Sequence, residues 1–239
     1  MVAQALLDLV DWRRRVGDLY RIRGLTPAPE ARGPQRKTLE LFRRGRDHLF
    51  KTHPQSPIEV EEREGFNGLS YFAPDGAYGV HARVEDGDGS ELLIDTGGDD
   101  GAVRYRRAAT LVFELGGQHC RLTVLSLVQY AGGLFVPFRD STSGHETYGG
   151  GRYLFDTIKN HLPMPVPETG KSMVEIDFNY AYNPSCAYNH RWACPLAPQE
   201  NWLPVPIRAG EKNYKAPSRR QSAATATRRQ PVGLRPQGG

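Results

Sequence analysis

The sequence predicts a mainly β fold of the α+β class: an antiparallel meander forming a barrel or sandwich, with two N-terminal helices and a loop-rich C-terminal region. Apolar residues recur at helical spacing before Pro54, and from Phe66 onward they alternate with smaller or polar neighbours. Turns rich in glycine and aspartate separate the alternating runs. We therefore expect an N-terminal helical region at residues 1–54, a β-rich domain at residues 55–215 and a tail at residues 216–239.

Two helices are expected at the start of the chain, on either side of a proline-rich break at residues 26–34. The first should span residues 3–21, where these apolar side chains follow helical spacing: Leu6, Leu9, Val10, Val16 and Tyr20. The second carries Leu39, Phe42, Leu49 and Phe50. It should end near His53, because the residue before a proline disfavours the helical conformation.

Strand-length runs follow at residues 66–72, 78–84, 91–96, 102–107, 109–115, 119–128, 134–138 and 173–178. Most of them are separated by short turns such as PDG, DGDG and GG. Short strands joined by short turns predict a barrel or a sandwich.

The formal charge of +4 depends on the tail. Residues 216–239 contain five arginines and no acidic residue, and removing those five charges from +4 leaves about −1 for the rest. A basic face of the kind that binds nucleic acid is therefore not indicated for the folded part. The tail has too few large apolar residues to offset its ordering entropy, so we expect it to be disordered.

The sequence favours a cytoplasmic protein that does not cross a membrane. Its N-terminus lacks the features of a signal peptide, and no segment approaches the roughly 18 apolar residues of a membrane span. Three cysteines, an odd number, fit reduced thiols better than a disulfide scaffold. The oligomeric state stays open.

The segment PFRDSTSGHETYGGGRY, at residues 137–153, combines charged groups, hydroxyls and glycines directly after a strand. Successive glycine amides can surround an anion, and Arg152 could bind a carboxylate or phosphate with two hydrogen bonds. A long turn in which Arg152 pairs with Asp140 explains the pattern equally well. The segment lacks the ending of a phosphate-binding P-loop.

The segment DFNYAYNPSCAYNHRWACP, at residues 177–195, begins at the end of a strand. Carboxylate, amide and phenol groups in this position can orient a polar substrate or transfer a proton, and they can equally cap turns. Functional use is favoured for Asp177 and the structural role for Asn183.

Three further residues of the second segment, Cys186, His190 and Cys194, could bind zinc with Glu200, His161 or water as the fourth ligand. Their spacing matches none of the common zinc patterns, so we predict no metal. A reactive pair of Cys186 and His190 is a weaker alternative.

Extended as LFVPFRDSTSGHETYGGGRYL and DFNYAYNPSCAYNHRWACPLAPQENWLPVPIRAGEK, the two segments closely resemble the signature blocks of an uncharacterised bacterial and archaeal family, the domain of unknown function 1684. The likeness runs from the second helix to Lys212 and implies no established activity. It includes both cysteines and omits His190. The motif positions are Phe138, Arg139, Asp140, Thr142, Gly144, Thr147, Tyr148, Gly151, Arg152, Tyr153, Asp177, Asn179, Tyr182, Asn183, Cys186, Cys194, Pro195, Glu200, Asn201 and Glu211.

These observations favour a β-barrel protein that binds a small polar or anionic molecule between the two signature loops and is a candidate enzyme. Arg152 would bind the anionic group, with Asp140 and Asp177 as acid and base candidates. The expected ligand-binding residues are Thr142, Tyr148, Gly151, Asn179, Asn183, Cys186 and Glu200. The alternatives are a non-catalytic structural domain closed by buried arginine–carboxylate pairs, and a barrel that binds flavin or another phosphate-bearing cofactor. The sequence does not identify the cofactor.

Overall fold

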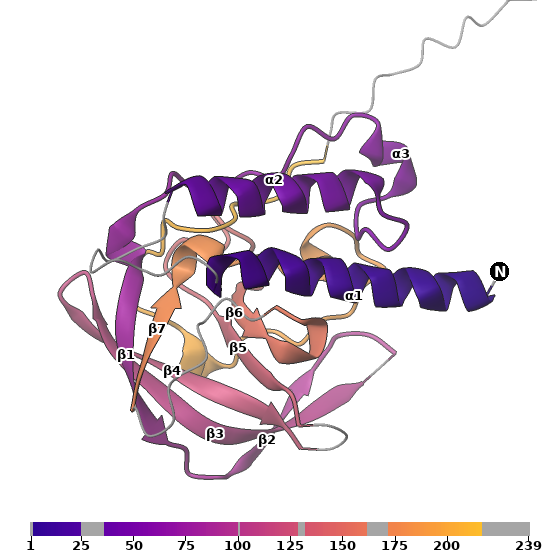
Figure 1. Ribbon diagram of the computed structural model, residues 1–239. Helices are drawn as coiled ribbons and strands as arrows, with labels where there is room; N and C mark the ends of the chain where they lie inside the picture. The colour runs from indigo at the N-terminus through magenta and orange to yellow at the C-terminus, as the bar shows by residue number, and fades with distance from the viewer. Residues whose placement is uncertain (1, 25–35, 100, 129–131, 162–171, 217–239) are drawn as a thin grey trace, which may run out of the picture.

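A computed structural model describes residues 2–24, 36–99, 101–128, 132–161 and 172–216. The part of the expected tail beyond residue 216 lies outside these residues. Three helices come first: α1 (Val2–Gly24), α2 (Arg36–Thr52) and the short α3 (Val60–Arg63). The helices α1 and α2 lie side by side along one end of the sheet (Figure 1).

Seven strands form one antiparallel sheet that curls into a half-barrel, which confirms the predicted fold class. They are β1 (Gly79–Asp86), β2 (Glu91–Asp95), β3 (Ala102–Leu115), β4 (Gln118–Leu127), β5 (Leu134–Phe138), β6 (Arg152–Asp156) and β7 (Met173–Asp177). The strand order is β6-β5-β4-β3-β1-β7, and β2 pairs with β3. Five short 3-10 turns among the described residues flank the strands or come after them: η1 (Gly76–Tyr78), η2 (Thr157–Lys159), η3 (Phe178–Tyr180), η4 (Ser185–Ala187) and η5 (Gln199–Asn201).

The main core packs side chains of the sheet against the C-terminal segment at residues 203–209. A second cluster joins α1 and α2 to the sheet domain, because Val16, Tyr20 and Phe42 pack with Tyr180 of η3. The helical layer and the region after β7 therefore bury a common set of side chains.

The amphipathic pattern expected for the first helix is only half realised. Val16 and Tyr20 are buried, whereas Leu6, Leu9 and Val10 are 61%, 39% and 65% exposed. The N-terminal end of α1 extends past the end of α2, which leaves these side chains exposed (Figure 1).

Three strand expectations need correction. Residues 102–115 form one strand, because a β-bulge between Arg107 and Ala109 continues the pairing with β4. Residues 66–72 form no strand and contribute an isolated bridge between Tyr71 and Glu211. The strand β6 at residues 152–156 was missed, since all five of its side chains are buried and show no alternation.

Candidate functional site

The first signature loop is closed by the carboxylate of Asp140. Its Oδ1 atom accepts hydrogen bonds from the backbone N–H of Thr142 at 2.8 Å, the Thr142 hydroxyl at 2.6 Å and the backbone N–H of Ile207 at 3.1 Å. The Thr142 hydroxyl also contacts that of Thr147 at 2.9 Å. Asp140 thus ties its own turn to the C-terminal segment.

Arg152 lies at the start of β6 and is 1% exposed. Its Nη2 donates to Asp140 Oδ2 at 2.9 Å and to the carbonyl oxygen of Ile207 at 2.7 Å. Its Nη1 donates to the carbonyl oxygens of Ala209 and Glu211. Burial lowers the pKa of Arg152, and the adjacent Asp140 opposes that shift. The guanidinium therefore fixes the backbone of residues 207–211.

Two glycines let the chain reach these positions. Gly151 has φ +90°, and a Cβ atom there would lie 2.4 Å from the carbonyl oxygen of Phe138. Gly210 has φ +72°, and its Cβ would lie 2.5 Å from the carbonyl oxygen of Ala181. Any side chain would meet backbone at both positions, which only glycine avoids.

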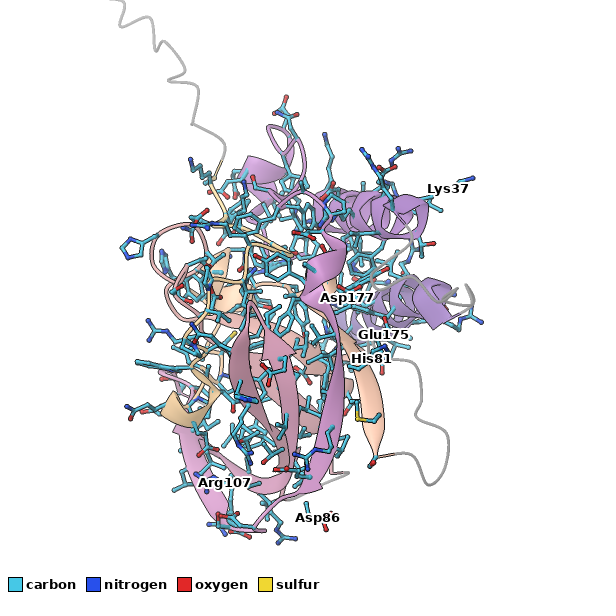
Figure 2. The ribbon with its side chains drawn as sticks, turned by 90° about the vertical axis from the view of Figure 1, so that its left-hand side faces the viewer. Lys37, His81, Asp86, Arg107, Glu175 and Asp177 are labelled. Carbon is cyan, nitrogen blue, oxygen red and sulfur yellow. The ribbon has the colours of Figure 1, made fainter. Side chains whose placement is uncertain are left out.

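Asp177 and Asn179 organise the start of the second signature loop. Asp177 Oδ1 accepts from the backbone N–H and the side-chain amide of Asn179, both at 2.9 Å. Asn179 then exchanges two hydrogen bonds with the backbone of Asp75. Both residues are 1% exposed. Asp177 lies at the end of β7 nearer the helices (Figure 2).

Beyond this loop, in the C-terminal segment, the carboxylate of Glu211 lies at the centre of a buried polar network. It forms an ion pair with Arg46 of α2, and it accepts hydrogen bonds from the hydroxyl of Tyr188 and from the backbone N–H of Asn183. Burial alone would lower the pKa of Arg46, but Glu211 raises it, and the net pKa lies well above the usual value. Arg46 therefore stays charged inside the protein.

An aromatic group adjoins this ion pair. The His161 ring stacks on Tyr182 at 4.3 Å between centroids and meets Tyr20 of α1 edge-on at 5.3 Å. The guanidinium of Arg46 lies 5.5 Å from the centre of the Tyr182 ring. Burial keeps the pKa of His161 well below 6.5, and the charge of Arg46 adds to the effect. The imidazole is thus neutral, and burial raises the pKa of Tyr20 and Tyr182, so both hydroxyls stay protonated.

Several polar atoms of this region are buried without a hydrogen-bond partner among the described residues. They include the hydroxyls of Tyr20 and Tyr182, Nδ1 of His161, Oδ1 of Asn183, Nε of Arg46, and Nε and Nη2 of Arg43. Arg43 is one turn before Arg46 on α2, and it donates from Nη1 to the carbonyl oxygen of Phe72. We refer to Tyr20, Arg43, Arg46, His161, Tyr182, Asn183 and Glu211 as the polar cluster.

The two signature loops meet at Cys186 in η4. The hydroxyl of Tyr148 donates to Cys186 Sγ at 3.6 Å. His190 is exposed. No group of three His, Cys, Asp or Glu residues in the described ranges could hold a metal ion.

Glu200 is separate from the other predicted residues. It forms an ion pair with Arg107 at 2.9 Å, with about 30% of each side chain exposed. Arg107 lies at the end of the sheet opposite to Asp177 (Figure 2).

The structure thus divides the predicted site residues into separate groups. Asp140, Thr142 and Arg152 form one connected set, Asp177 and Asn179 a second, and Tyr148 with Cys186 a third. Asn183 joins Glu211, which the sequence interpretation had not assigned to the site. Arg46 was also missed. It lies at helical spacing from Leu39, Phe42, Leu49 and Phe50, so the sequence places a cation on the apolar face of this helix.

Comparison with known proteins agrees with the resemblance of the signature blocks. Residues 64–212 match the model described as protein of unknown function, DUF1684. The chain belongs to this family. A solved structure, the solution NMR structure of an uncharacterised protein from Haloarcula marismortui, is 40% identical with a TM-score of 0.55. The match covers 74% of this chain and 92% of that one. No curated protein matches the chain.

The match places most of the polar cluster inside the DUF1684 region. Asn183, Tyr182, His161 and Glu211 lie within residues 64–212, whereas Tyr20, Arg43 and Arg46 come from the helices before it. No helix among the residues described is both long and apolar enough to span a bilayer.

Proposed function

We propose that this DUF1684 protein binds a small molecule with carboxylate or phosphate oxygens at the polar cluster. The observation that supports it is the set of buried polar atoms around the Arg46–Glu211 pair that have no hydrogen-bond partner among the residues described by the structure. Native proteins satisfy nearly all such atoms. An external group that can accept and donate hydrogen bonds is therefore expected there.

The energy at stake supports this proposal. A buried polar atom without a partner costs about 1–3 kcal/mol. Seven such atoms would cost about 7–21 kcal/mol, as much as the whole stability of a typical domain, about 5–15 kcal/mol. A bound molecule or ordered water must remove most of this cost.

The chemistry of the unpartnered atoms favours oxygen acceptors in the ligand. The hydroxyls of Tyr20 and Tyr182 stay protonated, and Arg43 has two buried nitrogens to donate. Donors of this kind suit carboxylate and phosphate oxygens. His161 is neutral and can accept or donate at Nδ1.

In this proposal the first signature loop positions the cluster. Arg152 holds the carbonyl oxygens of Ala209 and Glu211, which fixes the segment that carries the Glu211 carboxylate. The acid and base roles of Asp140 and Asp177 stay predictions, as do the ligand contacts of Tyr148 and Glu200.

The test is a thermal melt of the full chain in sodium acetate, sodium benzoate or sodium phosphate, compared with sodium chloride at equal ionic strength. A ligand present at a hundred times its Kd stabilises by about 2.7 kcal/mol, which corresponds to a Tm increase of about 5–10 °C. We expect at least one of the three anions to give such an increase in the wild type. The variant Tyr20→Phe/Tyr182→Phe, which removes both unpartnered hydroxyls and keeps both rings, should lose it.

Tyr78→Phe is the matched control, because the Tyr78 hydroxyl bonds to the carbonyl oxygen of Pro206 outside the cluster. It should respond to the anion as the wild type does. An equal response from the double variant, or no response of the wild type to any of the three anions, contradicts anion binding.

A non-catalytic structural domain is the second candidate, and the internal hydrogen bonds of Arg152 favour it. It predicts no anion response. Removing two unsatisfied hydroxyls would then leave the double variant as stable as the wild type or more so in chloride.

A further inference from the structure

We infer that the exposed half of α1, residues 2–10, is a dimerisation surface at which two copies of this chain pack their first helices antiparallel about a twofold axis. The inference is separate from anion binding, because these residues lie outside the polar cluster. Three features support it: the half-helix has an uncovered apolar face, this face has no charged side chain, and its sequence pattern is self-complementary.

The first feature is the amount of uncovered apolar surface. Five large apolar side chains within nine residues are between 39% and 79% exposed: Val2, Leu6, Leu7, Leu9 and Val10. No other helix or strand among the described elements has more than one exposed large apolar side chain. Helices in proteins are stabilised mainly by packing of an apolar face, and a contiguous exposed apolar patch marks an interaction site.

The protein's own contacts are made by another side of this helix. Trp12, just after the exposed half, packs on Phe50 of α2 with 5.7 Å between ring centroids. Val2, Leu6 and Val10 are spaced four residues apart, so they share one face. At 3.6 residues per turn this face lies about a third of a turn around the helix axis from Trp12. It is therefore open to a second layer.

The second feature is the absence of charge on this face. The polar side chains of residues 2–10 are Gln4 and Asp8, and Gln4 Nε2 donates to Asp8 Oδ1 at 2.8 Å. Helical geometry places both on the side opposite to Leu6. A partner that docks here must present an uncharged apolar surface, because an unpaired charge would lose its hydration. Within the described chain, the exposed half of α1 is the element with such a face, so a second copy supplies the matching surface.

The third feature is the self-complementary order of the residues. Residues 2–10 read VAQALLDLV, and reversing this segment about Leu6 exchanges apolar with apolar positions and Gln4 with Asp8. In a twofold-symmetric dimer each contact between two different residues occurs twice. An antiparallel pair centred on Leu6 therefore places Leu6 against Leu6 of the other copy, and Val2 against Val10 on both sides of the axis. The antiparallel arrangement also brings helix ends of opposite partial charge together.

The size of the surface predicts a reversible dimer. Five partly exposed aliphatic side chains from each copy bury several hundred square ångströms of apolar surface in total. Stable interfaces bury about 1,200–2,000 Å², and smaller ones belong to transient complexes. We therefore expect dissociation in the micromolar to millimolar range of chain concentration.

The test is sedimentation velocity of the full chain between about 1 µM and about 1 mM. The average mass should rise from the monomer value of 26.7 kDa towards twice that value as the concentration increases. Hydrogen exchange followed by mass spectrometry should show that protection of residues 2–10 increases over the same range. A chain that stays monomeric at about 1 mM contradicts the inference.

Two matched variants test the location of the interface. Leu6→Glu places two like charges against each other at the twofold axis, so it should weaken self-association by about tenfold or more. Leu41→Glu is the control, because Leu41 is also a leucine on a helix, α2, and is 48% exposed. It should dimerise as the wild type does. Circular dichroism checks that both variants fold, which their exposure in the monomer favours.

A charge exchange tests the antiparallel register. Leu6→Lys should self-associate as weakly as Leu6→Glu, whereas an equal mixture of the two variants should form mixed dimers, because opposite charges then meet at the axis. A mixture that stays monomeric, wild-type dimerisation of Leu6→Glu, or an equal loss in Leu41→Glu would overturn the inference. Protection of residues 2–10 that does not change with concentration would also overturn it, because it would place another segment of the same chain on this face.

Discussion

The internal ion pair of the first signature loop gives the most direct test of the structure. The side chains of Arg152 and Asp140 are both 0% exposed, and their nearest atoms lie 2.9 Å apart. Replacing Arg152 by Met keeps most of the side-chain volume but leaves the Asp140 charge buried without its partner. The carbonyl oxygens of Ile207, Ala209 and Glu211 lose their donor as well.

The expected cost of Arg152→Met is about 3–5 kcal/mol, which is typical when one member of a buried pair is removed. For a chain of this size that corresponds to a Tm decrease of about 6–20 °C. Asp140→Asn keeps an oxygen that can accept from Thr142 and Ile207, so its own cost should be smaller.

Equilibrium urea unfolding of both single variants and of the double variant measures the coupling. The double variant removes both charges, so it should be less destabilised than the sum of the single variants by about 1–3 kcal/mol. Arg208→Met is the matched control, because its ion pair with Glu146 is solvent-exposed and contributes little. Additive effects within about 0.5 kcal/mol, or a wild-type melt for Arg152→Met, would refute the structural role assigned to Arg152.

Two further predictions concern the backbone and the buried imidazole. Gly210→Ala should destabilise more than Gly89→Ala in urea unfolding, because both glycines have positive φ but only Gly210 would place a Cβ against backbone oxygens; equal losses would contradict this. His161 has a pKa below its unfolded value, so the unfolded chain binds a proton that the native state does not, and stability is lost as pH falls below about 6.5. Between pH 7.5 and pH 5.5 this loss is about 1.4 kcal/mol, and His161→Phe should remove it from the urea-derived stabilities; an unchanged pH dependence would show that His161 protonates in the folded protein.

The sequence predicted much of the sheet because alternation and turns are local signals. The strands β1, β2, β4, β5 and β7 lie where alternating or short apolar runs end in turn sequences. The hydrophobic pattern of the sequence was ambiguous for strands that do not have one buried face and one exposed face. In β6 every side chain is buried, and the bulge between Arg107 and Ala109 made one long strand resemble two.

The candidate site was less predictable because its contacts join distant segments. Arg46 meets Glu211 across 165 positions, and nothing local to either residue indicates the other. A cation among Leu39, Phe42 and Leu49 shows only that Arg46 needs a buried partner. For Arg152 and Asp140 the signal was local, since residues twelve apart flank one loop, and pairing between them was among the interpretations that the sequence allowed.

Tyr188 links the second signature loop to the polar cluster. This residue lies between Cys186 and Cys194 in sequence, and its hydroxyl donates to the same Glu211 carboxylate that pairs with Arg46. Glu211 is held from the other side, because Arg152 binds its carbonyl oxygen and Gly210 brings that backbone close to Ala181. Buried charges need well-placed partners. The position of residues 186–194 therefore affects the Arg46–Glu211 ion pair, and the ion pair in turn helps to fix the position of these residues. A structural change in residues 186–194 or at Arg46 would therefore affect Glu211, which contacts both α2 and the second signature loop through hydrogen bonds.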